Sequence, residues 1–433
     1  MGESIVSILG LIAALVVLLF LVMRGINIFL ATFVCTLIVA ITSATPISEA
    51  FRVNYMTGFA NFFKANWFMF LTGSLIGGAM RITGAAESVA KVLIKLLGVD
   101  KAVISIPLAC GLLAYGGVSA FVCSFAVYQI ALNVFREADL PRRFMPAALC
   151  FGCSTFAMVA PGAIQIHNTI IVNELKTTMM AGAVSGFISC GFMLVAGCIV
   201  LYKMVNSEKK KGFGFVEREG DDFAPSTDLP PFFISILPLI VTIATINTGV
   251  LSPEVGILLG TLLTIGLLHN RVTKKQVIDT TTNAISTSIQ SITNTCAVVA
   301  FGAVVQKSAS FPLIVESMTS LPGPQLLAVM IGTMVIAGIC GSASGGIGIA
   351  ASVLGPIFIA KGIDPASIHR IMAISSSSLD SLPHNGYIIT VTNGLCKETH
   401  KDAYWPVCVL TVIIPFIAAL LAVALFTLFP QWP

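Results

Sequence analysis

Apolar runs long enough to cross a membrane constrain this chain more than any other feature. The runs from Ile5 to Met23 and from Ile26 to Thr42 are each about 17–20 residues, the length at which an α-helix spans the hydrocarbon of a bilayer. Similar runs recur up to the one from Val407 to Phe429. The strands of a membrane barrel would alternate polar and apolar residues, and these runs do not. The sequence therefore predicts an all-α polytopic membrane protein with about 10–12 membrane segments.

Charge and motif content exclude several classes of function. Only 10% of the residues are charged, against about 25% in soluble domains. The net charge is +4 and the basic residues are scattered, so we expect no nucleic-acid-binding surface. The sequence has no Walker A, His-Glu-x-x-His or Gly-x-Ser-x-Gly motif, the signatures of nucleotide hydrolysis, zinc proteases and serine hydrolases. We expect a protein that is not an enzyme and holds no metal or organic cofactor.

One charged stretch divides the chain. Residues 203–231 include the basic run Lys209–Lys211, and basic residues next to a membrane span are retained in the cytoplasm. We therefore expect a membrane repeat at 1–202, a cytoplasmic linker at 203–231 and a second membrane repeat at 232–433. Arg24 likewise predicts that the loop between the first two runs lies inside. The corresponding loop of the second repeat, 247–254, has no basic residue and is predicted to lie outside.

The two repeats share residues at a nearly constant offset. Six pairs differ by 225 positions: Thr57 and Thr282, Gly77 and Gly302, Gly98 and Gly323, Gly116 and Gly341, Ser119 and Ser344, and Asp139 and Asp364. The offset then falls to 222 at Pro161 and Pro383 and to 220 at Asn173 and Asn393. An offset held over many residues indicates an internal repeat. Together with the opposite loop orientations, it predicts two inverted-topology repeats, an architecture of secondary transporters.

Polar segments containing Gly or Pro interrupt the apolar runs of each repeat at matching places. They are 115–119 and 153–162 in the first repeat, and 341–346 and 375–386 in the second. Lipid does not tolerate loose backbone or charge, so such segments belong inside protein or beside a water-filled cavity. An interrupted helix exposes free N–H groups at the positive end of its dipole, where a carboxylate can bind. We predict broken helices or re-entrant hairpins that form a mid-membrane site for a small organic acid anion.

The candidate substrate-binding residues are small or hydrogen-bonding residues at or near these interruptions. They are Gly116, Gly117, Ser119, Ser154, Thr155, His167 and Asn168 in the first repeat, and Ser342, Ser344, Gly345, Gly346, Ser377, Ser378, Asn385 and Asn393 in the second. Gly and Ser allow a carboxylate to approach the backbone, while amides and hydroxyls supply further hydrogen bonds. The competing interpretation of the glycines is close helix packing, because Gly341 and Gly345 fit a small-residue contact seam.

Asp380 and His384 form an ionisable pair in an apolar setting. A carboxylate at membrane depth is costly and indicates function by default, and histidine changes charge near physiological pH. We predict that the two residues carry a coupling proton. The alternative is a structural Asp–His hydrogen bond that fixes the broken helix.

The segment Gly341–Gly348, followed by Ser377-Ser378-Leu379-Asp380-Ser381-Leu382-Pro383-His384-Asn385-Gly386, resembles the gluconate permease family of proton symporters within the ion transporter superfamily. The part from Leu379 to Gly386 resembles most of all the 3-hydroxybutyrate permeases of that family. The resemblance implies proton-coupled uptake of a hydroxy- or sugar-acid anion, a homodimer, and a moving part that carries the broken helices against a scaffold. The motif occupies only the last third of the chain, and Thr155 stands where the offset of 225 would require a second Asp380.

These observations predict a multi-pass transporter of the bacterial inner membrane that imports a small carboxylate, such as 3-hydroxybutyrate or gluconate, by an elevator-type movement. Proton coupling is favoured over sodium coupling, which remains open because backbone carbonyls can bind sodium without a sequence signature. Two competing functions are an anion channel built on the same polar segments and, less favoured, an intramembrane enzyme that uses Asp380 and His384.

Overall fold

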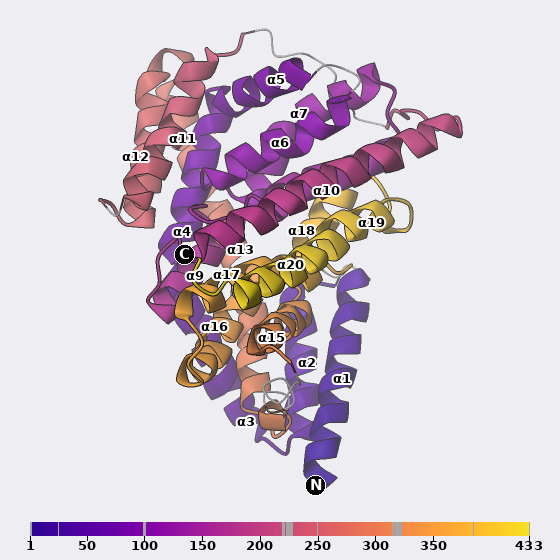
Figure 1. The fold of residues 1–433 in the computed structure, drawn as a ribbon, viewed down its shortest axis with the longest axis vertical. Helices are drawn as coiled ribbons and strands as arrows, with labels where there is room; N and C mark the ends of the chain where they lie inside the picture. The colour runs from indigo at the N-terminus through magenta and orange to yellow at the C-terminus, as the bar shows by residue number, and fades with distance from the viewer. Residues whose placement is uncertain are drawn as a thin grey trace.

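The computed structural model describes residues 2–24, 26–97, 101–218, 221, 228–248, 250–313, 316, 323–383 and 385–432. Every regular element within these ranges is helical (Figure 1). Four helices of the described chain are long and apolar enough to cross a membrane, and seven shorter apolar helices accompany them. Apolar side chains such as Val16 and Leu262 are more than half exposed on the surface of the bundle, as expected of positions that face lipid. The predicted all-α polytopic membrane fold is confirmed.

The first half of the chain contributes the helices before the linker. They are α1 (Gly2–Met23), α2 (Ile28–Thr42), α3 (Ile47–Glu49) with a π-helical turn (Ala50–Tyr55), α4 (Met56–Ile82), α5 (Ala85–Leu97), α6 (Ala102–Tyr115), α7 (Ala120–Glu137), a 3₁₀ turn (Arg142–Phe144), α8 (Met145–Ser154), α9 (Ile166–Leu175) and α10 (Ala183–Lys210).

The second half contributes the helices after the linker. They are α11 (Phe232–Asn247), α12 (Pro253–Leu267), a 3₁₀ turn (His269–Arg271), α13 (Lys274–Gln306), α15 (Gln325–Cys340), α16 (Ala343–Ala360), α17 (Pro365–Leu379), α18 (Gly386–Ile389) with a π-helical turn (Thr390–Leu395), and α19 (His400–Cys408), which continues through a π-helical segment (Val409–Ile413) into α20 (Ile414–Leu428).

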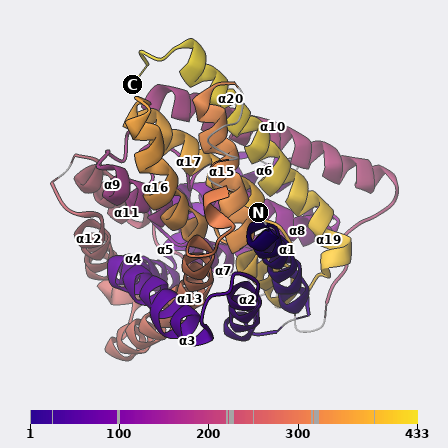
Figure 2. The same cartoon turned by 90° about the horizontal axis from the view of Figure 1, so that it is seen from below.

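The helices of the second half follow the order of those of the first. Both ends of α12 lie 225 positions after the ends of α2, Ile28 matching Pro253 and Thr42 matching Leu267. The contacts repeat as well: α12 packs on α4 as α2 packs on α13, and α15 packs on α17 as α6 packs on α8. Figure 2 shows α4 and α13 between α12 on one side and α2 on the other. The internal repeat is therefore a repeat of structure.

Equivalent helices of the two halves run in opposite directions. A Cβ on Gly58, at the start of α4, would lie 2.5 Å from Ala303 at the end of α13. At the other end of the same pair, a Cβ on Gly78 would lie 2.7 Å from Thr280. The start of α10 likewise meets the end of α20, which lies alongside it in Figures 1 and 2. These antiparallel pairs confirm the inverted arrangement of the repeats, whereas the boundaries 1–202, 203–231 and 232–433 stay predictions.

A buried ion network holds the linker against both halves. The guanidinium of Arg142 forms a two-point ion pair with Asp221, one contact at 3.0 Å, and both side chains are only 2% exposed. Its Nε also donates to the carbonyl oxygen of Cys396 at 3.1 Å. Burial by itself raises the pKa of the Asp221 carboxyl, but hydrogen bonds from Arg142 and from the backbone of Arg218 outweigh it, so the pKa lies below its ordinary value. Asp221 is thus a structural residue of the linker.

Replacing Asp221 with asparagine should lower the free energy of unfolding by about 1–3 kcal/mol at pH 7, because a charged hydrogen-bond acceptor of Arg142 is lost. A lowered folded-state pKa stabilises the protein above the unfolded value of about 3.9, and this contribution disappears as the pH falls through the folded pKa. The difference between Asp221→Asn and the parent, measured by thermal unfolding in detergent, should therefore shrink below about pH 4. Glu217, which is exposed and paired with Arg136, supplies the control Glu217→Gln, with an expected loss below about 1 kcal/mol. Equal losses for both variants would contradict the prediction.

Candidate functional site

Each half has its first helix break at a glycine with positive φ. Gly117 follows α6 with a φ of 96°, and Gly341 follows α15 with a φ of 55°. Residues with a side chain rarely adopt such backbone angles, so glycine is favoured at both positions. A Cβ on Gly117 would in addition lie 3.2 Å from the carbonyl oxygen of Ile164. The interruptions at 115–119 and 341–346 are therefore sharp turns from which α7 and α16 begin.

The start of α16 carries the hydroxyls predicted to bind a carboxylate. Ser342 is the N-cap residue, its Oγ accepts from the N–H of Gly345 at 3.3 Å, and it lies 3.2 Å from the Oγ of Ser344. Gly346 serves packing, because a Cβ there would lie 2.4 Å from the Cα of Ala337 on α15.

The equivalent start of α7 differs. Ser119 is the N-cap residue but makes no capping hydrogen bond with its side chain. Gly116, just before it, lies against α11, where a Cβ would meet the side chain of Leu239 at 3.0 Å. Of the two turns, the one in the second half is therefore richer in side-chain hydrogen-bonding groups.

Side-chain amides close the second break of the first half, between α8 and α9. The Nε2 of Gln165 donates to the carbonyl oxygens of Ala114 and Val118, and so joins this break to the first one. The Nδ2 of Asn168 donates to the carbonyl oxygens of Ala160 and Ala163 at 3.1 and 3.0 Å. Free carbonyls are costly at membrane depth, and these amides satisfy them. The amide N–H groups of Asn168 are therefore engaged with the backbone.

Ser154 and Thr155, at the end of α8, are buried and bonded within their own helix. Their hydroxyls donate to the carbonyl oxygens of Cys150 and Phe151, respectively. Each oxygen keeps capacity to accept a hydrogen bond. They are thus placed at the break but do not point a free donor into it.

The second break of the second half contains Asp380. This residue ends α17 and is 4% exposed, and one carboxylate oxygen accepts from the Oγ of Ser381 at 3.1 Å. Asn385 fixes the break: its Oδ1 accepts from the N–H groups of Tyr387 and Ile388, and its Nδ2 donates to the carbonyl oxygen of Asp380 at 2.9 Å. Asp380 makes no ion pair within the described ranges, and its predicted partner His384 lies outside them. Asp380 is thus a buried carboxyl at a helix break.

Four consecutive serines precede Asp380 on α17, and all are buried. The hydroxyls of Ser376 and Ser377 donate to carbonyl oxygens of their own helix, and that of Ser378 donates to the carbonyl oxygen of Val412 at 3.0 Å. The Oγ of Ser375 has no hydrogen-bond partner in the described part of the chain. Of the four hydroxyls, the one without a described partner therefore belongs to Ser375, whereas those of the predicted site residues Ser377 and Ser378 are bonded to the backbone.

The breaks of the two halves meet through α7 and α18. The hydroxyls of Tyr387 and Ser124 are 2.6 Å apart, and the ring of Tyr387 stacks edge-on against Phe121 at 5.1 Å. His167 stands 220 positions before Tyr387, on the equivalent helix α9, which packs on α16. The Nδ1 of His167 is buried and has no hydrogen-bond partner among the described residues, which leaves a polar atom to be satisfied on α9, the helix equivalent to α18.

The sequence prediction missed Arg370 on α17, the largest of the fully buried side chains among the described residues. Its guanidinium donates to the carbonyl oxygens of Val159, Met179 and Ala181 at 2.6, 3.1 and 2.9 Å, and to the Oδ1 of Asn168 at 3.1 Å. All four acceptors belong to the first half, so Arg370 ties α17 to the broken region of the other repeat. A charged residue five positions before Ser375, within a buried helix, is the sequence signal that could have identified it.

The remaining predicted residue and two surface pockets lie away from the breaks. Asn393 is exposed, and its Oδ1 lies 3.1 Å from the Nδ1 of His400. One pocket lies between α10 and α19 and a second near Arg81 and Arg271. Neither is lined by a predicted site residue.

Comparisons with known proteins identify a different family from the one the motif indicated. The family model described as "Tripartite ATP-independent periplasmic transporter, DctM component" matches residues 12–432. The uncharacterized transporter YxjC of Bacillus subtilis is 28% identical over 93% of this chain and 95% of that protein. An uncharacterized transporter of Haemophilus influenzae is 24% identical over 55% of this chain and 54% of that protein.

Among solved structures, the YdaH transporter of Alcanivorax borkumensis, described as having an unusual topology, is similar in fold. Its TM-score is 0.59 at 16% identity, over 89% of this chain and 90% of that one.

The assignment to the gluconate permease family is therefore wrong. It depended on two short segments at helix breaks, whereas the family model covers almost the whole chain. A short motif of Asp, Pro, Asn and Gly is what a helix cap and a turn need, and Asn385 is indeed the N-cap residue of α18. Caps and turns of this kind recur in different families.

Proposed function

The chain belongs to the family of the DctM component of tripartite ATP-independent periplasmic transporters, and from this we propose that it is the membrane carrier of a system that imports a small carboxylate with a coupling ion. It is a secondary transporter of this family, and the family is one of transporters, not enzymes. The observation that carries the proposal is Asp380, a buried carboxyl without a described ion pair at a helix break between antiparallel halves.

The carboxylate would bind where the broken helices converge. The first turn of α16, with Ser342 and Ser344, offers N–H groups and hydroxyls to an anion. The unpartnered Oγ of Ser375 and Nδ1 of His167 add hydrogen-bonding capacity from α17 and α9. In this proposal the other candidate residues at the breaks shape the site around the anion. Hydroxy acids fit the mixture of hydroxyl and backbone donors.

Asp380 would carry the coupling proton. A proton on its carboxyl removes a charge that is costly at membrane depth, so loading and release of the proton could accompany movement of the site across the membrane. The predicted role of His384 as second member of the pair is retained in the proposal. Sodium remains the alternative coupling ion, since carbonyl oxygens at broken helices can bind it.

Further proposals concern the surroundings of the carrier. The family description names a tripartite, periplasmic system, so we propose that other components work with this chain in the inner membrane of a bacterium. An elevator-type movement of the broken helices and the predicted homodimer belong to the same proposal.

Exchange of labelled substrate tests the carrier. A thermal-shift screen of hydroxy acids, gluconate and dicarboxylates, at two pH values, first identifies a binding compound. In proteoliposomes preloaded with that compound, the labelled form should enter faster than in empty ones, with saturable kinetics. A carrier shows this stimulation because its binding site crosses back to the outer face of the membrane faster when it is occupied than when it is empty. Flux that does not saturate and is not stimulated would indicate the anion channel and overturn the proposal.

A further inference from the structure

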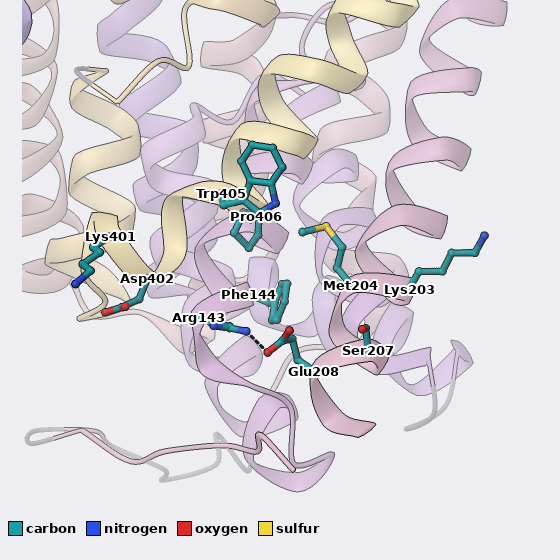
Figure 3. Close-up of a pocket in the computed structure, with 10 residues that line it drawn as sticks. All are labelled: Arg143, Phe144, Lys203, Met204, Ser207, Glu208, Lys401, Asp402, Trp405 and Pro406. Atoms are coloured by element: carbon teal, nitrogen blue, oxygen red, sulfur yellow. Dashed lines mark hydrogen bonds and ion pairs between the residues drawn. The ribbon is translucent and has the colours of Figure 1, made fainter. Parts of the chain in front are cut away.

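A pocket of about 520 Å³ lies between the end of α10 and the start of α19 (Figure 3). The volume is within the range of about 300–1,000 Å³ typical of small-molecule sites. Arg143, Lys203 and Lys401 supply three basic side chains to its lining. The pocket is separate from the broken helices, and the transport proposal gives it no role.

The two acidic side chains of the lining differ in their partners, because only Glu208 is in an ion pair among the described residues. Glu208 forms ion pairs with Arg143 and, at 2.9 Å, with Lys211. Asp402 accepts a hydrogen bond from the hydroxyl of Thr399 at the start of α19.

The two lysines of the lining, unlike Glu208, are not held by an ion pair. Lys203 and Lys401 are exposed and make no ion pair within the described chain. Figure 3 shows them at opposite flanks of the pocket. The three basic and two acidic side chains give the lining a net charge of +1, and its two lysines are the basic groups without an ion pair, which favours an anion.

An apolar surface adjoins these charges. Trp405 is 64% exposed, and Figure 3 shows its indole beside Pro406 and above the ion pair of Arg143 and Glu208. Tryptophan is enriched at the boundary between lipid tails and headgroups. A ligand that satisfies both the lysines and the indole has an anionic head and an apolar tail.

The pocket also lies on the predicted cytoplasmic side of the protein, where anionic lipid headgroups are available. It adjoins the end of α10, which leads into the basic run Lys209–Lys211. That run predicts the cytoplasmic side, and basic pockets between membrane helices on this side bind lipid headgroups.

We propose that this pocket binds the phosphate headgroup of an anionic phospholipid, held between Lys203 and Lys401, with an acyl chain against Trp405. Bound there, the lipid would link α10 of the first half to α19 of the second. Binding of the lipid does not depend on which substrate the protein transports.

The test measures binding of phosphatidylglycerol to the detergent-purified protein by native mass spectrometry and thermal unfolding. The double variant Lys203→Gln/Lys401→Gln should bind about 30-fold more weakly, roughly fivefold for each lysine. The variant Trp405→Ala should also weaken binding. The matched control Lys274→Gln/Lys275→Gln removes the same charge from exposed lysines of α13 and should leave affinity unchanged.

Two results would contradict the proposal: stabilisation by a ligand that is not an anionic lipid, and loss of affinity in the control variant. Phosphatidylcholine and inorganic phosphate should give little stabilisation. Equal stabilisation by inorganic phosphate would identify a site for a soluble anion and overturn the lipid proposal. Equal loss of affinity in the two double variants would show that net charge, not this pocket, attracts the lipid, and would overturn it as well.

Discussion

Replacing Asp380 with asparagine should abolish accumulation of the substrate against its gradient while exchange of labelled substrate continues. One pH unit is worth about 1.4 kcal/mol per proton, or tenfold in concentration, so a gradient of about two units should drive about 100-fold accumulation by a carrier that couples one proton. Asparagine resembles the carboxyl group in shape but cannot release a proton, so accumulation should fall to the level without a gradient. Uptake into proteoliposomes with an imposed pH gradient measures this.

The comparison of accumulation with exchange separates the possible roles of Asp380. Loss of accumulation with preserved exchange identifies a proton carrier, whereas loss of both identifies a binding or structural residue. The exposed Asp279 of α13 supplies the control Asp279→Asn, which should keep both activities. Undiminished accumulation by Asp380→Asn would exclude this carboxyl from coupling, because another group would then carry the proton.

Replacing Arg370 with methionine should lower the free energy of unfolding by about 3–5 kcal/mol, the range observed when one partner of a buried charged interaction is removed. Three carbonyl oxygens and the Asn168 amide oxygen would lose a donor, and each unsatisfied buried group costs about 1–3 kcal/mol. Removing a buried charge offsets part of this, because the guanidinium has no described carboxylate partner. Thermal unfolding in detergent measures the net effect.

Two further variants make the result specific. Arg370→Lys keeps the charge, but an ammonium group has three donors and lacks the planar fork of arginine, so it should recover only part of the loss. Arg136 is half exposed and pairs with an exposed Glu217, so Arg136→Met should change stability by less than about 1 kcal/mol. An Arg370→Met protein that unfolds at the parent temperature would contradict the assigned role.

The architecture could be predicted from the sequence because its causes are local. Apolar run length determines which segments can span lipid, and the constant offset appears in the structure as α2 and α12, whose ends differ by the same number of positions. The turns at Gly117 and Gly341 were predictable because their positive φ angles favour glycine. These features depend on neighbours within a few residues along the chain.

The details of the site depend on partners distant in sequence. No pattern around Arg370 indicates that its acceptors are carbonyls about 190–210 positions earlier, and none indicates that Ser377 and Ser378 donate to backbone, leaving Ser375 free. The family was misassigned for a related reason. The two segments that carried the resemblance reflect local helix breaks, and family membership is a property of the whole chain.

The antiparallel pairing of α4 with α13, and of α10 with α20, has a consequence for the parity of membrane crossings. Because the second half is inserted upside down relative to the first, the first half must traverse the bilayer an odd number of times before the linker is reached. Gain or loss of a single crossing in that half would turn the second half over and make both antiparallel pairs parallel. A duplication that produced such a chain could therefore succeed only with a unit of odd crossing number.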